Sequence, residues 1–308
     1  GECKVKVTSG QFDQGMVLDM ALSQDERKQG YGLMCMAKPI SEELVIEWGT
    51  LDAKPKLFPP REDALFVVTD KRPIAARVVE LRLRPVGQPV RYWPGQYVTI
   101  GNPRADIPAR AYSISNAPRP DGELVLQVAR ADGGVTSNWI HDQLAIGENV
   151  KISGAYGTFI GDPSVDTPVL CIAAGTGLAP VLALAEAALR RGFKKPVTML
   201  FSARTREDVY SQGMMAWWRT KHRNFDYKVT LTREQAEGFL AGRIDAVLPQ
   251  LFKDLSKHTI FVAGSPEVVD TCVAAAKKQG AVDELIHTEG FFAQQQPVVA
   301  DADHLLPV

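Results

Sequence analysis

A short stretch at residues 110–115 combines the side chains that a planar, phosphorylated ligand requires. It holds Arg110, the aromatic ring of Tyr112 and the hydroxyls of Ser113 and Ser115, and its side chains alternate as in a β-strand. A guanidinium binds phosphate through paired hydrogen bonds, and a ring offers a stacking surface. An ordinary edge strand with one polar face is the alternative. The stretch therefore predicts a ligand platform if further binding motifs accompany it.

A second motif, at residues 132–137, places two glycines and two hydroxyls just before a predicted helix over residues 136–144. The free backbone N–H groups and the dipole at a helix start favour an anion. A glycine turn with a hydroxyl cap would explain the same residues without a ligand. Because this motif and Arg110 fall in one predicted domain, we favour a pyrophosphate held between them.

Glycine-containing turns also follow apolar strands later in the chain, at residues 175–180 and 263–266. Glycines let a backbone approach a ligand closely, and parallel sheets bind ligands at the carboxyl ends of their strands. Another strand end carries Arg204 and Arg206, which could meet a nucleotide phosphate or ribose, although surface arginines often have no specific role. These turns predict a nucleotide site at one edge of a parallel sheet.

The first two motifs lie in a segment, residues 62–162, that has the pattern of an antiparallel β domain. Alternating stretches bounded by turns predict strands over residues 77–83, 96–100 and 124–130. Only one helix interrupts this pattern. We therefore expect a small closed barrel.

The pattern changes in residues 163–292, where apolar strands alternate with helices as in a parallel sheet with crossover helices. Strands are predicted over residues 169–174, 197–201, 227–231, 259–263 and 285–288, and helices over 180–191, 209–222, 246–252 and 266–279. Residues 1–50 form a separate compact unit, residues 51–61 a linker and residues 293–308 a tail. The predicted fold class is therefore multidomain, with β and α/β parts.

The composition argues against several classes of partner. Of 308 residues, 35 are Lys or Arg and 36 are Asp or Glu, so we expect no nucleic-acid partner. No stretch approaches the length of a membrane span, and the N-terminus lacks a signal-peptide pattern. The four cysteines are sparse, which favours the reducing cytoplasm, and two of them, Cys171 and Cys272, are predicted to be buried thiols. We expect a cytoplasmic protein that is monomeric when free and has no membrane partner.

In order and spacing, the motifs at residues 110–113, 134–137, 175–180 and 264–266 resemble those of the ferredoxin–NADP reductase superfamily. The resemblance covers residues 62–292. It implies an antiparallel six-stranded flavin-binding β-barrel followed by a Rossmann-like parallel α/β nucleotide-binding domain. The cofactors that it implies are FAD and NADH, with NADPH as the alternative.

The resemblance also implies a role for each motif. Arg110 is expected to contact a flavin phosphate, Tyr112 to pack on the isoalloxazine and Ser113 to lie near the flavin N5. Phe291 or Phe292 corresponds to the C-terminal aromatic residue near the flavin, so the predicted catalytic residues are Tyr112, Ser113 and Phe292. The FAD pyrophosphate is assigned to Gly134, Thr136 and Ser137, and the nicotinamide nucleotide to Gly175, Thr176 and Gly177. Further cofactor contacts are expected from Val128, Arg130, Val135, Ser202, Arg204, Arg206, Gly264 and Ser265.

One position departs from the pattern. Many members carry a cysteine before the Gly-x-Pro turn, close to the nicotinamide, and this chain has Ala263. Because the cofactors carry most of the hydride-transfer chemistry, we expect the reaction to be retained without that thiol. The choice between NADH and NADPH stays open, since Arg204 and Arg206 could meet a 2′-phosphate but no residue decides it.

The N-terminal unit resembles the C-terminal part of a plant-type 2Fe-2S ferredoxin of the β-grasp type. Such clusters use Cys-x4-Cys-x2-Cys and a distant fourth cysteine. The flanks of Cys3 look like those of the third ligand, and residues 30–35 look like the approach to the fourth ligand, Cys35. Two unrelated free cysteines are the alternative. We expect the chain to begin inside the cluster loop, with a complete 2Fe-2S cluster only in a longer protein and none, or an incompletely ligated one, here.

This domain order resembles the reductase components of multicomponent bacterial oxygenases for aromatic hydroxylation or demethylation. NADH would reduce FAD, and single electrons would pass through the iron–sulfur centre to a separate oxygenase component. A stand-alone flavin or ferric reductase with a vestigial ferredoxin unit is the first alternative. A redox-sensing module that binds FAD and nucleotide without turnover is the second.

Overall fold

The computed structural model describes residues 4–15, 17, 22–34, 36–47, 57–162 and 164–291. Three predicted site residues, Cys3, Cys35 and Phe292, lie outside these ranges. Within them, no helix combines the length and the apolar character that crossing a membrane requires.

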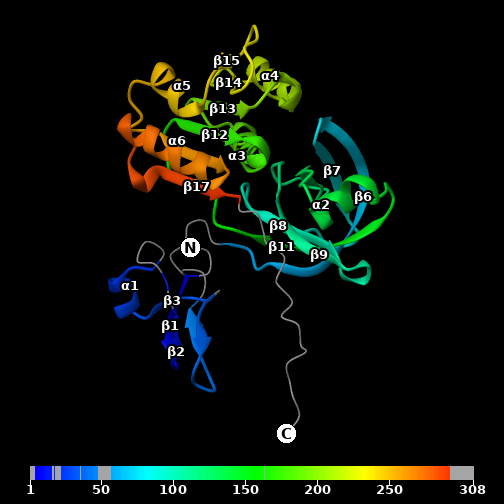
Figure 1. Cartoon of the computed structure of the whole chain (residues 1–308), viewed down its shortest axis with the longest axis vertical. Helices are drawn as coiled ribbons and strands as arrows, with labels where there is room; N and C mark the ends of the chain where they lie inside the picture. The colour runs from blue at the N-terminus through cyan, green and yellow to red at the C-terminus, as the bar shows by residue number, and fades with distance from the viewer. Residues whose placement is uncertain are drawn as a thin grey trace.

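The N-terminal unit, coloured blue in Figure 1, is built on two small antiparallel sheets. In the larger sheet, β1 (Lys4–Ser9) lies between β3 (Tyr31–Leu33) and β5 (Val45–Glu47). The smaller sheet pairs β2 (Phe12–Asp13) with β4 (Lys38–Pro39). A short helix, α1 (Gln24–Lys28), begins at a capping box in which Ser23 and Glu26 satisfy each other's backbone N–H groups.

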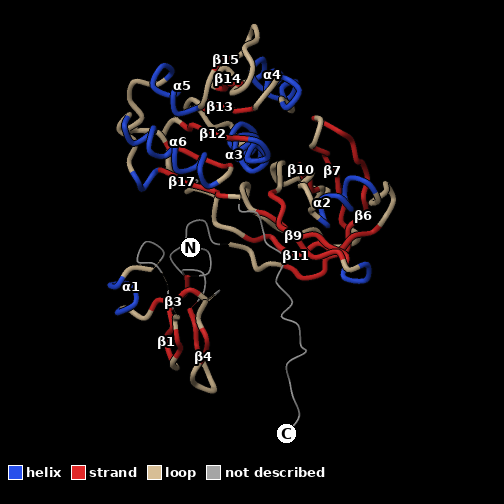
Figure 2. The backbone as a smooth tube through the Cα atoms, in the orientation of Figure 1, coloured by secondary structure: helices blue, strands red, loops and turns tan. Residues whose placement is uncertain are grey.

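The second unit is a six-stranded antiparallel sheet in the order β10-β7-β6-β11-β8-β9, as the resemblance implied. A bridge between Ile114 and Leu126 joins the end of β9 back to β10, so the sheet closes on itself only in part. Figure 2 shows these strands curving around α2. Their bounds are β6 (Arg61–Ala75), β7 (Val78–Pro85), β8 (Tyr97–Asn102), β9 (Ile107–Ser113), β10 (Leu124–Ala129) and β11 (Asn149–Tyr156).

The long strand β6 was not among the predicted strands, although the strand over residues 77–83 and the two later ones were found. Charged residues and Pro73 interrupt its alternation, and its register with β7 shifts twice, once after Val68 and once after Pro73. Bulges of this kind bend a strand and blur the period-2 pattern on which sequence analysis depends. The helix α2 (Val135–Asp142) packs Trp139 and Ile140 into the core of this half-barrel.

The third unit is a parallel sheet in the order β15-β14-β13-β12-β16-β17. The core on one face holds side chains of α3 and α4, and the core on the other face holds those of α5 and α6 (Figure 1). The strands are β12 (Val169–Ala174), β13 (Val197–Ala203), β14 (Phe225–Leu231), β15 (Leu240–Ala241), β16 (Thr259–Gly264) and β17 (Ile286–Gly290). The helices are α3 (Leu178–Arg190), α4 (Gln212–Lys221), α5 (Ile244–Leu251) and α6 (Pro266–Lys278). All nine predicted elements of this domain occur within a few residues of their expected bounds.

The chain order reverses between β12 and β16, because the strands run outward from β12 to β15 and then return to β16 on its other side. Such a switch point leaves a crevice at the carboxyl ends of the two central strands. Cys171 on β12 and Cys272 on α6 are buried free thiols, as predicted, and burial raises the pKa of each to about 12. Neither thiol is available as a thiolate at neutral pH.

Candidate functional site

A cavity of about 520 Å³ opens between β9 and the first turn of α2, and we call it the β9–α2 cavity. It brings Arg110, Tyr112 and Ser113 together with two lining residues from far along the chain, Thr176 and Phe291. The residues 133–137, with their two glycines and two hydroxyls, line it as well. The two motifs that the sequence suggested as one pyrophosphate site therefore share one space, and Thr176 of the later glycine turn borders it.

The start of α2 presents free backbone donors to this cavity. The N–H groups of Val135, Thr136 and Ser137 belong to the first turn, where a helix has no internal acceptors for them. The two hydroxyls are already used within the protein: Thr136 Oγ1 donates to the Pro108 carbonyl, and Ser137 Oγ accepts from the Ala131 N–H. An anion here would thus be bound chiefly by the backbone and the helix dipole.

Gly134 is required by this arrangement. A Cβ at this position would lie 2.6 Å from Ser137 Oγ and 2.8 Å from the Ala131 side chain. Real side chains do not approach so closely, so a larger residue would push the helix start out of place. The glycine therefore keeps the N-terminus of α2 open to a ligand.

Tyr112 and Arg110 lie two residues apart on β9, opposite Val98 and Ile100 of β8. Tyr112 packs partly against the core of the half-barrel, and this burial raises the pKa of its phenol to about 12. The ring is therefore neutral at physiological pH. The structure gives Arg110 one hydrogen bond, to the Ala109 carbonyl at 3.0 Å, and no ion pair with a carboxylate of the described chain.

Gln127 is a lining residue that sequence analysis missed. Its side chain is 5% exposed, and its Nε2 donates to Ser211 Oγ at 3.2 Å, across to the nucleotide-domain side. Its buried Oε1 has no hydrogen-bond partner among the described residues. An unpaired buried acceptor is costly, so the cavity fits a ligand that donates a hydrogen bond there. The available signal was one polar residue inside the apolar strand over residues 124–129.

A second cavity of about 830 Å³, the strand-end cavity, lies at the carboxyl ends of β12, β13 and β16. It is lined by Gly175, Thr176, Ser202, Arg204 and Ser265, five of the residues predicted to bind a nucleotide. Four residues line both this cavity and the β9–α2 cavity: Ala129, Ala131, Asp132 and Thr176. The two spaces therefore adjoin, and a ligand in one can reach a ligand in the other.

Close packing at Gly177 shapes the turn between β12 and α3. A Cβ there would lie 2.1 Å from the carbonyl oxygen of Ala263 in β16. The turn is further held by Tyr210, whose hydroxyl donates to the Gly175 carbonyl at 2.9 Å and whose burial raises its pKa. Ala263 itself is fully buried in β16, so the position of the family cysteine holds a small core side chain here.

The arginines around the strand-end cavity differ in whether a carboxylate of the protein already pairs with them. Arg206 does not line it, because Glu234 holds its guanidinium at 2.7 Å and accepts its backbone N–H at 2.9 Å. Arg130 forms a two-point pair with Asp142, which raises the arginine pKa and lowers the carboxyl pKa. Arg204 and Arg233 line the cavity and form no ion pair with the described carboxylates. Of the two arginines singled out from sequence, the structure therefore leaves only Arg204 available.

Among the remaining predicted residues, some lie at the β9–α2 cavity or support it, whereas Val128 lies in the core. Phe291 lines the β9–α2 cavity, and its N–H donates to the Gly264 carbonyl at 2.8 Å, so Gly264 holds this segment in place without lining either cavity. Val128 does not face a ligand: its side chain is fully buried in the half-barrel core, and its carbonyl pairs with His141 Nε2. Val128 thus lines neither cavity, since an alternating strand does not reveal which of its two faces is the core, and its cofactor contact stays a prediction.

Three further lining residues had no sequence signal: Arg77, Arg243 and Tyr97. Arg77 sits at the β6–β7 turn, where it pairs with Asp132 and donates to the Arg130 carbonyl. The two adjoining cavities together form what we call the cofactor groove. Such residues reach this groove from distant parts of the chain. Only the tertiary fold brings them there.

The half-barrel, the parallel-sheet domain and the groove that they share are those of an oxidoreductase that binds a flavin and a nicotinamide nucleotide. Two family models match the chain: the oxidoreductase FAD-binding domain over residues 66–160 and the oxidoreductase NAD-binding domain over residues 171–274. The chain is 31% identical over 295 residues to an aromatic O-demethylase reductase subunit of Amycolatopsis sp., covering 94% of this chain and 87% of that protein. It is 30% identical over 295 residues to the reductase component of phenol 2-monooxygenase from Pseudomonas sp., covering 94% and 82%.

A solved structure of an Amycolatopsis cytochrome P450 reductase, GcoB, superposes with a TM-score of 0.82 at 30% identity, covering 94% of this chain and 87% of that one. The chain belongs to the ferredoxin reductase family and is an FAD- and NAD-binding oxidoreductase of the electron-transfer type. The glycine-built helix start at α2, the tight turn at Gly177 and the unpaired acceptor of Gln127 fit these two cofactors.

Proposed function

We propose that this protein carries electrons from NADH through FAD and a 2Fe-2S cluster to the oxygenase component of an aromatic-compound hydroxylase or demethylase. The observation that supports it most directly is the joined groove, in which the β9–α2 cavity and the strand-end cavity share Thr176 and Asp132. A flavin takes two electrons from a nicotinamide, and this transfer requires the two rings to meet. The flavin then releases the electrons singly.

Within this proposal, Arg110 binds a flavin phosphate and Tyr112 covers the isoalloxazine face. The backbone N–H groups of Val135, Thr136 and Ser137 bind the pyrophosphate, which favours FAD over a flavin with one phosphate. Ser113 lies near the flavin N5, and Gln127 Oε1 accepts a hydrogen bond from a polar edge of the ring system. Phe291, or Phe292 next to it, closes the space beside the flavin.

The nicotinamide nucleotide is assigned to the strand-end cavity. The turn 175–177 approaches its nicotinamide end, and Ser202, Arg204 and Ser265 contact its phosphates and riboses. Arg206, held by Glu234, is not needed in this scheme. Arg204 and Arg233 could meet a 2′-phosphate, so NADPH remains the alternative donor to NADH.

The acceptor side of the proposal is supported by the relatives. The reductase subunit of an aromatic O-demethylase and the reductase component of phenol 2-monooxygenase both match nearly the whole chain, the N-terminal unit included. Cys3 and Cys35 are the two proposed cluster ligands in this chain. Both lie outside the described residues, among which no group of three or more metal-binding side chains occurs.

An anaerobic absorbance titration tests the proposal. The visible flavin absorbance of the flavin-loaded protein is expected to bleach when about one equivalent of NADH is added. No bleaching with NADH or NADPH would contradict it. Absence of iron-cluster absorbance would favour a stand-alone flavin or ferric reductase. Binding of FAD and nucleotide with negligible cytochrome c reduction would favour a redox-sensing module.

A further inference from the structure

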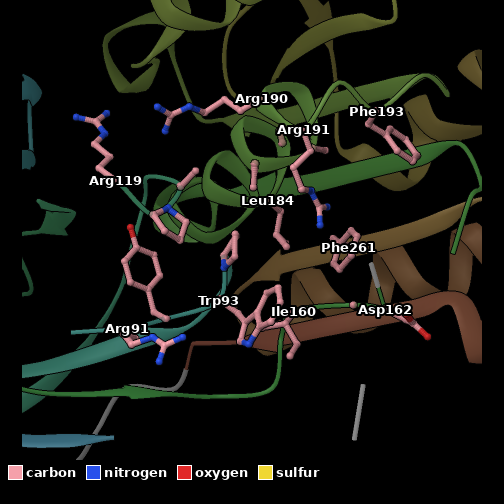
Figure 3. Close-up of a pocket in the computed structure, with 18 of the residues that line it drawn as sticks. Arg91, Trp93, Arg119, Ile160, Asp162, Leu184, Arg190, Arg191, Phe193 and Phe261 are labelled. Atoms are coloured by element: carbon pink, nitrogen blue, oxygen red, sulfur yellow. The ribbon is translucent and has the colours of Figure 1, made fainter. Parts of the chain in front are cut away.

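A third cavity, also of about 520 Å³, is separate from the cofactor groove. It lies where the last turns of α3 meet two segments of the half-barrel domain, residues 89–94 and 117–119. None of its lining residues lines the β9–α2 cavity or the strand-end cavity. We call it the α3 cavity, and Figure 3 shows the side chains around it.

Aromatic and aliphatic side chains form most of its wall. In Figure 3, Trp93, Leu184 and Phe261 surround one space. The ring of Phe261 is fixed from two sides, edge-on by Phe159 at 5.6 Å and face-on by His287 at 4.8 Å between centroids. A wall of this kind offers a flat, preformed surface to a planar apolar group.

Four arginines also line the α3 cavity, against one carboxylate, Asp162. Two of the arginines are engaged by acids: Arg119 bonds to Glu123, and Arg190 lies 3.7 Å from Glu186. Both extend away from the cavity in Figure 3. Their charge is therefore largely compensated and directed elsewhere.

The other two arginines differ. Arg91 stacks over the ring of Phe58, with 4.0 Å between its guanidinium carbon and the ring centroid. Arg191 directs its guanidinium toward Leu184 and Phe261 in Figure 3. Neither forms an ion pair with any carboxylate in the described part of the chain. An uncompensated guanidinium thus lies beside an aromatic wall.

We propose that the α3 cavity binds a small aromatic carboxylate of one or two rings, with its ring against Trp93 and Phe261 and its carboxylate on Arg191. A guanidinium pairs with a carboxylate through two parallel hydrogen bonds, whereas a free phosphate would need more donors than this largely apolar wall supplies. The volume falls within the range of small-molecule sites, about 300–1,000 Å³. The inference does not depend on the electron acceptor proposed above.

One helix connects the α3 cavity to the cofactor groove. Helix α3 begins at the turn 175–177, beside the groove, and its other end, from Leu184 to Arg190, lines the α3 cavity. A ligand in the cavity contacts this helix and the half-barrel segment 89–94 together. Binding therefore stabilises one arrangement of the two domains and raises the unfolding temperature of the flavin-loaded protein.

Calorimetric titration of the flavin-loaded protein with 2-naphthoate tests the proposal, with 2-naphthamide and acetate as controls. We expect saturable binding at one site per chain for 2-naphthoate. The neutral amide should bind at least about tenfold more weakly, because it loses the charge-assisted pair, and acetate should give no saturable binding. Absence of saturable binding by the carboxylate, or equal binding by the amide, would overturn the proposal.

Two variants locate the site. Arg191→Gln should weaken 2-naphthoate binding at least about tenfold, and Ala188→Phe, which fills the cavity without changing charge, should abolish it. Arg104→Gln removes an exposed arginine that lines none of the three cavities and should leave 2-naphthoate binding unchanged. Flavin content and NADH oxidation should be retained in all three, which verifies that they fold. Unchanged binding in both Arg191→Gln and Ala188→Phe, or complete competition by NAD⁺, would show that the ligand sits elsewhere and reject the site.

Discussion

The hydroxyl of Thr136 donates a hydrogen bond to the main-chain carbonyl of Pro108, with 2.5 Å between the two oxygens. This contact joins the first turn of α2 to β9, so the backbone donors of the helix and the side chains of Arg110 and Tyr112 keep one spacing. Thr136 is almost fully buried, at 2% exposure. One hydrogen bond between two distant segments thus sets the width of the β9–α2 cavity.

Thr136→Val should lower both stability and FAD affinity. The substitution keeps the shape of the side chain but leaves the Pro108 carbonyl without its donor, which costs about 1–3 kcal/mol of unfolding free energy. Urea unfolding and a fluorescence titration of the apoprotein with FAD measure the two effects. Thr136→Ser retains the hydroxyl and is the matched control. Normal FAD binding by the valine variant would mean that this contact does not set the spacing.

Arg110→Gln should weaken FAD binding without lowering stability. Arg110 forms no ion pair with the described acids, so little in the apoprotein depends on its charge, whereas a charge-assisted phosphate contact is worth about 1.5–3 kcal/mol. We expect about 10- to 100-fold weaker FAD binding and unchanged riboflavin binding, since riboflavin has no phosphate. Arg104→Gln, which lies outside the cavity, is the control. An equal loss for FAD and riboflavin would assign Arg110 to the ring instead of the phosphate.

Gly177→Ala should raise the KM for NADH and destabilise the nucleotide domain. The added Cβ would lie 2.1 Å from the Ala263 carbonyl, so the turn must move away from β16, at a cost of about 1–3 kcal/mol. Steady-state kinetics and thermal unfolding report the two effects. Gly213→Ala in α4 meets nothing within 4 Å and should instead stabilise by up to about 1 kcal/mol. A KM and a melting temperature for Gly177→Ala equal to those of the parent would contradict the required contact.

Stability should fall as the pH drops below about 6.5. Burial lowers the pKa of His287 below its usual 6.5, with Asp162 opposing the shift, and burial likewise lowers the pKa of His141 and His258. Between the folded and the unfolded pKa the unfolded chain binds more protons, so the unfolding free energy rises with pH there and levels off above about pH 7.5.

Urea unfolding between pH 5 and pH 8 checks this expectation. His287→Gln should remove part of the slope, because it removes one of the three partly buried imidazoles whose pKa is lowered. The carboxylates whose pKa is lowered, such as Asp142 with its usual value of 3.8, lose their contribution only at lower pH and do not explain a slope in this range. A flat profile across pH 5 to 8 would contradict the assigned cause.

The sequence by itself determined the domain order and the parallel sheet, because apolar strands such as residues 169–174 and amphipathic helices leave local periodic signals. It also identified Arg110, Tyr112, Ser113 and the turn 134–137 as parts of one site, since each motif is short and contiguous. Strand β6 was missed, because its bulges and charges break the local period.

Only the tertiary structure decided which of the candidate residues face a ligand. Val128 belongs to the core, Arg206 is held by Glu234, and Gln127 carries an unpaired buried acceptor, and each depends on contacts between residues far apart in sequence. Contacts between distant residues also join the two cofactor cavities at Thr176 and form the separate α3 cavity. Local patterns record which segments become strands and helices, whereas the packing of two domains creates the spaces between them.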